Sequence, residues 1–137
     1  MYNLKISSLM KGMYDPDELL LHANFQILVD FIDKENPGDT IDWSCDNEHK
    51  AIWKEIVALY KWWTEERIER EKLDPLNNKD VKKPDLTNVD NFLNYDREEY
   101  KEFEEACQES AELELAWYKE DTENLLRLIK IREWLWT

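Results

Sequence analysis

Glycine and proline, the residues that most often end helices and form turns, are scarce in this chain: its 137 residues include two glycines and four prolines. Glu, Leu, Lys and Trp are abundant instead. This balance favours helices and leaves too few turn residues for a many-stranded sheet. The length suits one domain with a core of its own. We therefore predict an all-α protein, a small helical bundle in which residues 1–137 form a single domain.

The charge restricts the kinds of partner. A formal net charge of −14 repels nucleic acid and anionic membranes, so direct binding to either is not expected. Basic protein surfaces and cations are the natural counterparts. The acidity does not indicate disorder, because seven Trp, six Tyr and four Phe supply core material.

The two cysteines, Cys45 and Cys107, form no CxxC pair, and the N-terminus has no signal-peptide pattern. No apolar run approaches the roughly 20 residues that span a bilayer. These features predict a cytoplasmic protein with reduced cysteines. No cofactor is expected.

The first clear helix is predicted after a short helix or arm that ends at Gly12. Asp15 suits the N-cap, Pro16 the first helical position and Glu18 the capping box. Asn36-Pro37-Gly38-Asp39 is a turn signal that ends the helix near Glu35. Apolar residues cover most of its circumference, so it is predicted to be the central helix. Its polar stripe consists of His22, Gln26, Asp30 and Asp33.

A second, Trp-bearing helix is predicted from Ser44–Asp46 to about Lys72. Residues 73–95, with Pro75 and Pro84, form a long connection that includes one helical turn around Val89–Leu93. A long acidic helix follows from about Asp96 to Leu135. Asp121 would point inward from it, which predicts a kink or break there.

The acidic helix carries a row of glutamates. Between Asp96 and Glu123, twelve acidic residues stand against three basic ones. Steps of four, three, four and three place five carboxylates on one helical face, and these are Glu98, Glu102, Glu105, Glu109 and Glu112. Over roughly 21 Å, their spacing is of the same order as that of phosphates along a nucleic-acid strand. The row is either a solubilising face or a surface that imitates nucleic acid for a basic partner.

The tryptophans suggest a second surface. Trp62 and Trp63 are adjacent, so their side chains diverge by about 100° on a helix. Trp134 and Trp136 cannot share a face either. We expect at least one of each pair to be partly exposed. Either the tryptophans surround a compact bundle, or Trp62, Trp134 and Trp136 contribute to a surface for a partner or a second copy of the chain.

Two pairs of residues have a spacing found in metal sites. Glu18 and His22 share one helix, while Asp46 and His49 begin the next. In helical bundles, carboxylates with Glu-x-x-His motifs bind a di-metal centre. Structural roles are the simpler interpretation, with Asp46 as an N-cap. Cys45 beside this pair leaves a zinc site short of its four ligands.

The acidic helix also contains carboxylates three residues apart, at Glu102/Glu105 and Glu109/Glu112. Such pairs hold Mg²⁺ against nucleotide phosphates, and the all-α nucleotide pyrophosphohydrolases of the MazG type use them from two helices. A second set on a following helix and a basic cluster for phosphate are both missing here. Nucleophile triads, P-loops and dinucleotide fingerprints are also absent from the sequence. Enzymatic activity is therefore the less favoured prediction.

One further pattern consists of the segment Tyr14–Phe31, of Asp42-Trp43 and of His49 with the segment from Trp53 to Trp63. Through this pattern residues 14–75 resemble small accessory proteins of tailed bacteriophages that have no assigned activity. The resemblance implies a small protein made in the host cytoplasm during infection and carries no catalytic assignment. Acidic helical proteins in that setting often bind and block host enzymes.

Together these features predict a non-enzymatic interaction protein. Its partner would be a host nucleic-acid-binding or defence protein with a basic surface. The chain would inhibit or redirect this partner by imitating DNA, which would be an anti-defence function. The alternative is a small metal- or nucleotide-binding protein or enzyme of the MazG-like type. A homodimer joined through exposed tryptophans is a third hypothesis.

Overall fold

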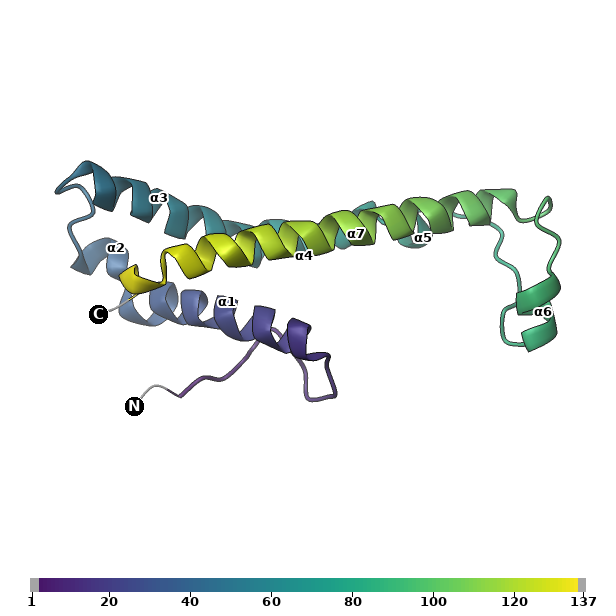
Figure 1. Cartoon of the computed structure of the whole chain (residues 1–137), viewed down its shortest axis with the longest axis horizontal. Coiled ribbons are helices and arrows are strands. Elements are labelled where there is room, and N and C mark those ends of the chain that lie inside the picture. Colours follow the sequence, from purple (N-terminus) through teal and green to yellow (C-terminus); the bar gives the residue numbers. More distant parts are fainter. Residues whose placement is uncertain (1–2, 136–137) are drawn as a thin grey trace. The chain divides into compact units, whose positions relative to one another are not determined.

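The computed structural model describes residues 3–135, and this range contains helices and no strand (Figure 1). The all-α prediction is confirmed. The α-helices are α1 (Pro16–Glu35), α2 (Pro37–Thr40), α3 (Asn47–Lys61), α4 (Arg67–Glu69), α5 (Pro75–Asn78), α6 (Val89–Asn94) and α7 (Lys101–Lys130). A π-helical turn at Trp62–Glu66 joins α3 to α4, and 3₁₀ turns occupy Arg70–Leu73 and Arg132–Trp134.

The residues form two compact units. The first unit runs up to Arg67 and resumes at Glu120, and the second unit extends from Ile68 to Lys119. Helix α7 therefore contributes its earlier part to the second unit and its later part to the first. Each unit is described below by itself.

Helix α1 begins and ends as its sequence predicts. Asp15 precedes it in extended conformation and Pro16 is its first residue, although the Asp15 side chain makes no capping hydrogen bond. Asn36 ends the helix with a left-handed backbone (φ 47°). This conformation is tolerated by asparagine better than by most residues with a side chain. The chain then enters α2 directly.

The first half of the polar stripe of α1, at His22 and Gln26, contacts the N-terminal segment, which is an arm and not a helix. The Ser7 backbone N–H and hydroxyl both donate to Gln26 Oε1 at 2.9 Å. Ser8 Oγ lies 2.7 Å from His22 Nδ1, and Gln26 Nε2 donates to Asp30 Oδ1 at 3.0 Å. The buried polar side chains of α1 thus have partners, as such groups require. On other faces of α1, three apolar side chains stay exposed: Leu19, Leu20 and Ile27.

The core of the first unit is built from α1, α3, the π-helical turn and the end of α7. Phe25 and Leu28 from α1 meet Ile56 and Leu59 from α3, and all four are fully buried. Further core residues are Leu21, Phe31, Trp43, Trp62, Trp63, Leu128 and Ile131. Large apolar side chains removed from water in this way are the main source of folding free energy.

The expectation that Trp62 or Trp63 is partly exposed is wrong, because both are 7% exposed. Both rings pack against Phe25 on α1: the Trp63 ring stacks on it with centroids 4.6 Å apart, and the Trp62 ring is tilted against it at 5.3 Å. Trp62 Nε1 also donates to Glu120 Oε1 on α7 at 2.6 Å. Contacts with α1 and α7 therefore bury the two adjacent rings.

The π-helical turn lies at these tryptophans. The Arg67 backbone N–H donates to the Trp62 carbonyl, five residues earlier, and the Thr64 hydroxyl donates to the Tyr60 carbonyl at 2.8 Å. The predicted second helix is therefore helical to Leu73, one residue beyond the prediction, but with changes of helix type along the way.

Helix α7 is shorter than predicted at both ends and has no break. It begins at Lys101, since residues 97–100 form turns in which Asp96 Oδ1 accepts the Glu98 N–H at 3.0 Å. The predicted break at Asp121 is also wrong, because α7 continues through this residue. Arg67 donates to both carboxylate oxygens of Asp121 at 3.0 Å, so the inward carboxylate is neutralised within a continuous helix.

The second unit has little apolar interior. Its buried side chains are small or cyclic: Pro75, Pro84, Ala106 and Ser110. Helix α5 was not expected within the predicted connection, whereas α6 confirms the predicted helical turn. Asn88 caps α6 by accepting the Asp90 N–H at 2.9 Å. Helix α6 exposes its apolar side chains, with Val89 72%, Phe92 60% and Leu93 66% exposed.

Candidate functional site

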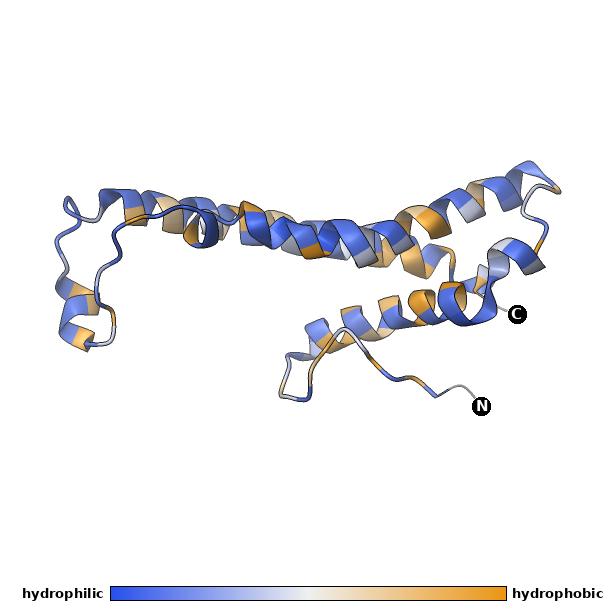
Figure 2. Cartoon of the chain, turned by 180° about the vertical axis from the view of Figure 1, so that it is seen from behind, coloured by the Kyte–Doolittle hydropathy of each residue, from blue (hydrophilic) through white to orange (hydrophobic). Residues whose placement is uncertain are grey.

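The glutamate row is on the surface of the second unit. All five predicted carboxylates belong to exposed residues, and the first half of α7 is mainly hydrophilic (Figure 2). Glu98, however, precedes the helix, so the row on α7 itself consists of Glu102, Glu105, Glu109 and Glu112. At 1.5 Å per residue these four span about 15 Å.

Lysines from the preceding connection neutralise part of the acidic surface. Lys79 Nζ lies 3.1 Å from Glu109 Oε2, and both side chains are about half exposed. Lys82 pairs with Glu99. Glu112 accepts a hydrogen bond from Gln108 Nε2 at 3.0 Å and is not paired with a cation among residues 3–135. Within the same range, Glu102 and Glu105 form no ion pair.

A shallow groove of about 240 Å³ runs beside the row. Lys79 and Val81 line one part of it, and the α7 residues that line it are Glu102, Glu105, Ala106 and Glu109. Three carboxylates and one ammonium group therefore surround the same space. This lining suits a cationic side chain better than a phosphate, because negative charge predominates.

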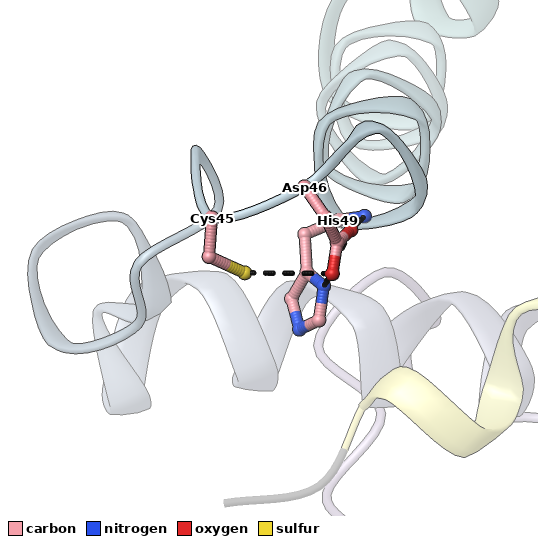
Figure 3. Close-up of side chains that lie close together, drawn as sticks. All are labelled: Cys45, Asp46 and His49. Atoms are coloured by element: carbon pink, nitrogen blue, oxygen red, sulfur yellow. Dashed lines mark hydrogen bonds and ion pairs between the residues drawn. The ribbon is translucent and has the colours of Figure 1, made fainter.

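A second cluster of chemically active side chains lies where α3 begins (Figure 3). Cys45, Asp46 and His49 place one sulfur, one oxygen and one nitrogen within 4.8 Å of one another. His49 Nδ1 is 2.9 Å from each oxygen of Asp46. Cys45 Sγ is 3.8 Å from Asp46 Oδ2. Asp46 also caps α3, since Oδ1 accepts the His49 N–H at 2.7 Å, as the sequence predicts.

The surroundings of this cluster shift the pKa values of the thiol and of the carboxylate in opposite directions. Hydrogen bonds from the His49 backbone and ring lower the pKa of Asp46. Loss of hydration, followed by the negative charges of Asp46 and Asp42, raises the pKa of the Cys45 thiol. At neutral pH the cluster therefore combines a carboxylate with a protonated thiol.

Aromatic rings hold the His49 side chain in place. The Trp134 ring meets it edge-on with centroids 4.9 Å apart, and the Trp43 ring lies 6.2 Å away. Trp43 is itself fixed, since it stacks on Trp53 at 5.0 Å and donates from Nε1 to the Pro37 carbonyl at 2.8 Å. The imidazole is consequently packed on two sides, although Cys45 and Asp46 are exposed.

Glu18 and His22 do not form a metal site. Glu18 is exposed, whereas His22 is 7% exposed and packs against the Trp63 ring at 4.8 Å. Burial and then the positive charge of Arg67 lower the pKa of His22 to about 4, partly offset by Asp121. His22 is therefore a neutral core residue at physiological pH.

A magnesium site of the MazG-like kind is not assembled by the described residues. Among residues 3–135, Cys45, Asp46 and His49 are the one group of three or more Cys, His, Asp or Glu side chains whose ligand atoms converge. The pairs Glu102/Glu105 and Glu109/Glu112 lie on one exposed helix face without carboxylates from a second helix.

The tryptophan surface is smaller than predicted. Trp62 is buried, and its indole N–H is already bonded to Glu120. Trp134 is half-buried beside His49, which agrees with partial exposure. Trp136 lies outside the described residues.

Sequence reasoning missed two contributors to these sites. Lys79 and Lys82 come from the segment Lys79-Asp80-Val81-Lys82-Lys83, whose basic character in an acidic region was a detectable signal. Cys45 stands beside Asp46 and His49 in the sequence, but three ligands fall short of the four that a structural zinc site has. The convergence of the three side chains depends on the loop conformation, which no sequence pattern specified.

Comparison with known protein families, with curated proteins and with solved structures gives no match to this chain. Among the described residues, no helix combines the length and the apolar character that crossing a bilayer requires.

Proposed function

We propose that this protein is a non-enzymatic acidic interaction protein. Its glutamate row binds a basic surface of a nucleic-acid-binding or defence protein and occupies the place of nucleic acid there. The observation that carries the proposal is that Glu102, Glu105 and Glu112 are exposed on one uninterrupted helix and have no cationic partner among residues 3–135. The resemblance to phage accessory proteins makes a host protein the natural partner.

The helix geometry supports this function. Four carboxylates over about 15 Å give one negative charge per roughly 5 Å, against one phosphate per about 3.4 Å along a DNA strand. Like charges at these spacings cost an isolated helix a few tenths of a kcal/mol per pair. A basic partner would remove this repulsion on binding.

Within this proposal, Lys79 competes with the partner for the Glu109 carboxylate. Its ammonium group occupies one carboxylate of the row, in a pair exposed enough to be worth at most about 1 kcal/mol. A partner's Arg or Lys can displace Lys79 at little cost. The row therefore offers three carboxylates without a cationic partner among residues 3–135, and a fourth, Glu109, whose lysine a partner can displace.

The decisive experiment compares two triple charge reversals. In the first variant, Glu102, Glu105 and Glu112 become Lys, and in the matched control Asp17, Glu35 and Glu133 become Lys. All six are exposed, so both variants change the net charge equally. Proteins captured from host lysate by the native protein should be lost with the first variant and kept with the control.

The same capture experiment is repeated at increasing salt concentration and with added duplex DNA. Captured partners should be released as ionic strength rises, because screening weakens exposed charge pairs, and duplex DNA should compete with the protein for them. Helicity measured by circular dichroism should remain unchanged in both variants. Capture that survives the reversal at Glu102, Glu105 and Glu112, or that is insensitive to salt, contradicts the proposal.

The variant Lys79→Ala tests whether the glutamate row binds a partner or only keeps the protein in solution. Removal of Lys79 frees Glu109, so a partner that uses the row should bind about two- to fivefold tighter, the equivalent of up to about 1 kcal/mol. Lys72→Ala, which removes an exposed lysine paired with Glu69 outside the row, is the control and should leave the affinity unchanged. Equal effects of the two variants would show that net charge alone matters.

A further inference from the structure

We propose that Cys45, Asp46 and His49 form a binding site for Zn²⁺, or for a similar divalent transition-metal ion that prefers sulfur and nitrogen, where α3 begins (Figure 3). This site is independent of the glutamate row, since all three residues belong to the first unit. Its test is separate from that of the proposed function.

The distances between the ligand atoms fit one ion. Around a tetrahedral zinc with bonds of about 2.0–2.3 Å, neighbouring ligand atoms are roughly 3.3–3.6 Å apart. Asp46 Oδ2 lies 2.9 Å from His49 Nδ1 and 3.8 Å from Cys45 Sγ. Movements of a few tenths of an ångström therefore suffice at both edges. The third edge, from sulfur to nitrogen, is up to 4.8 Å long, so the exposed Cys45 side chain has to rotate and bring its sulfur about 1 Å closer to the imidazole nitrogen.

The two oxygens of Asp46 permit a division of roles. Oδ1 accepts the His49 backbone N–H at 2.7 Å and so caps α3. Oδ2 is the oxygen that faces the Cys45 sulfur. A metal bound through Oδ2 leaves the cap intact, so that binding does not disturb the helix end.

The site is largely pre-organised. The cap fixes the Asp46 carboxylate, and the Trp43 and Trp134 rings pack on the His49 imidazole. Holding ligands in place before the ion arrives reduces the conformational entropy lost on binding. Cys45 lies in the loop before the N-cap and is exposed, so its side chain can adjust.

The ligand set indicates the class of ion. Mg²⁺ and Ca²⁺ prefer oxygen ligands alone, whereas a thiolate and an imidazole suit Zn²⁺. Three protein ligands leave the fourth position for water, since Cys45 and Asp46 are open to solvent. Coordination by Cys45 releases the thiol proton to solvent.

Cobalt(II) provides a direct test, because thiolate coordination produces a charge-transfer band and tetrahedral geometry produces strong visible bands. Tag-free, reduced protein is titrated with Co²⁺ alone and then with Zn²⁺. We expect both sets of bands at one Co²⁺ per chain and their loss when Zn²⁺ displaces the cobalt.

Matched variants assign the ligands. Cys45→Ser should abolish the charge-transfer band, while Cys107→Ser, which alters the cysteine of the second unit, should keep it. Asp46→Asn retains an N-cap residue but loses the carboxylate, so helicity should persist while Co²⁺ affinity falls by more than about tenfold. His49→Ala should weaken binding similarly.

Two outcomes overturn the proposal. One is the absence of a charge-transfer band in reduced protein whose far-ultraviolet circular dichroism is native. The other is a band that survives Cys45→Ser or disappears with Cys107→Ser. Because the glutamate variants described above leave these residues intact, they should keep the cobalt spectrum, whatever their effect on a protein partner.

Discussion

The two units of this chain differ in the kinds of side chain that they bury. The first unit buries Phe25, Leu28, Ile56 and Leu59 completely and surrounds them with tryptophans. The second unit buries mainly Pro75, Pro84, Ala106 and Ser110, and leaves large apolar side chains of α6 in solvent. Since buried apolar area provides most of the stability of a fold, we expect the first unit to determine stability.

The same contrast holds for charged groups. In the first unit, Arg67 and Asp121 are 22% and 14% exposed and form two hydrogen bonds. In the second unit, Lys79 and Glu109 are each more than half exposed and share one contact. The Arg67–Asp121 pair of the first unit therefore serves the structure, and the Lys79–Glu109 pair of the second can exchange partners.

The largest effect should come from the aromatic core. Phe25→Ala removes a fully buried ring that stacks on Trp63 and contacts Trp62, so the free energy of unfolding should fall by about 3–5 kcal/mol. Urea denaturation followed by tryptophan fluorescence measures this loss. Phe92→Ala, at a residue 60% exposed on α6, should cost less than about 0.5 kcal/mol. Similar losses would remove the distinction between the units.

Acid should weaken the first unit through His22. Its pKa is about 4 in the folded protein and 6.5 in the unfolded chain, so below pH 6.5 the unfolded state binds a proton that the folded state refuses. The contribution of neutral His22 to stability is complete above pH 6.5 and is lost as the pH falls toward 4. Between pH 7 and 5 the loss should be about 2 kcal/mol. In urea titrations, His22→Gln should remove this part of the pH dependence, and an unchanged slope would contradict the assignment.

Removal of one ion pair from each unit should give unequal losses. Asp121→Ala leaves Arg67 partly buried without this partner, and we expect a loss of about 1–2 kcal/mol, below the 3–5 typical of fully buried pairs. Glu109→Ala should cost between 0 and about 1 kcal/mol. Double-mutant cycles with Arg67→Ala and Lys79→Ala measure the two coupling energies. A coupling at Lys79–Glu109 as strong as that at Arg67–Asp121 would refute the comparison.

The smallest effect is expected from the glutamate row itself. Glu105→Lys relieves repulsion with Glu102 and Glu109 on the same helix face, so thermal stability should stay equal or rise by a few tenths of a kcal/mol. Calorimetry at low salt measures the change, which high salt should reduce. A marked destabilisation would instead assign Glu105 a structural role.

Local signals in the sequence predicted much of the helical organisation. Pro16 and the Asn36-Pro37-Gly38 turn placed α1 to the residue, and Asp46 marked the start of α3. Helix α7 begins at Lys101, five residues later than predicted, because residues 97–100 form turns. Asp96 nevertheless has the hydrogen bonds of an N-cap, since its Oδ1 accepts the Glu98 N–H and its carbonyl accepts the Tyr100 N–H, so the sequence indicated the start of this segment but not the turns that follow it.

Contacts between distant residues account for the remaining differences. The inward carboxylate of Asp121 suggested a kink because its partner, Arg67, is 54 residues away in sequence. For the same reason the burial of Trp62 could not be predicted, since Glu120 lies 58 residues beyond it. The exposed glutamates of α7 were placed correctly on a solvent face, because helical periodicity alone determines that property.

The π-helical turn makes the first unit sensitive to chain length. A turn that closes over five residues contains about one residue more than an α-helical turn, so every later side chain is shifted by one position around the helix axis. If the same sequence continued as an α-helix through this turn, Glu66 would take the direction of Arg67 and present an acid to Asp121 and to the Trp63 ring, over which Arg67 now lies. Substitutions at Thr64–Glu66 alter only surface or half-buried side chains. A single deletion among them keeps Arg67 at Asp121 only if the turn becomes α-helical, because a retained π-helical turn would bring Ile68 to that position instead.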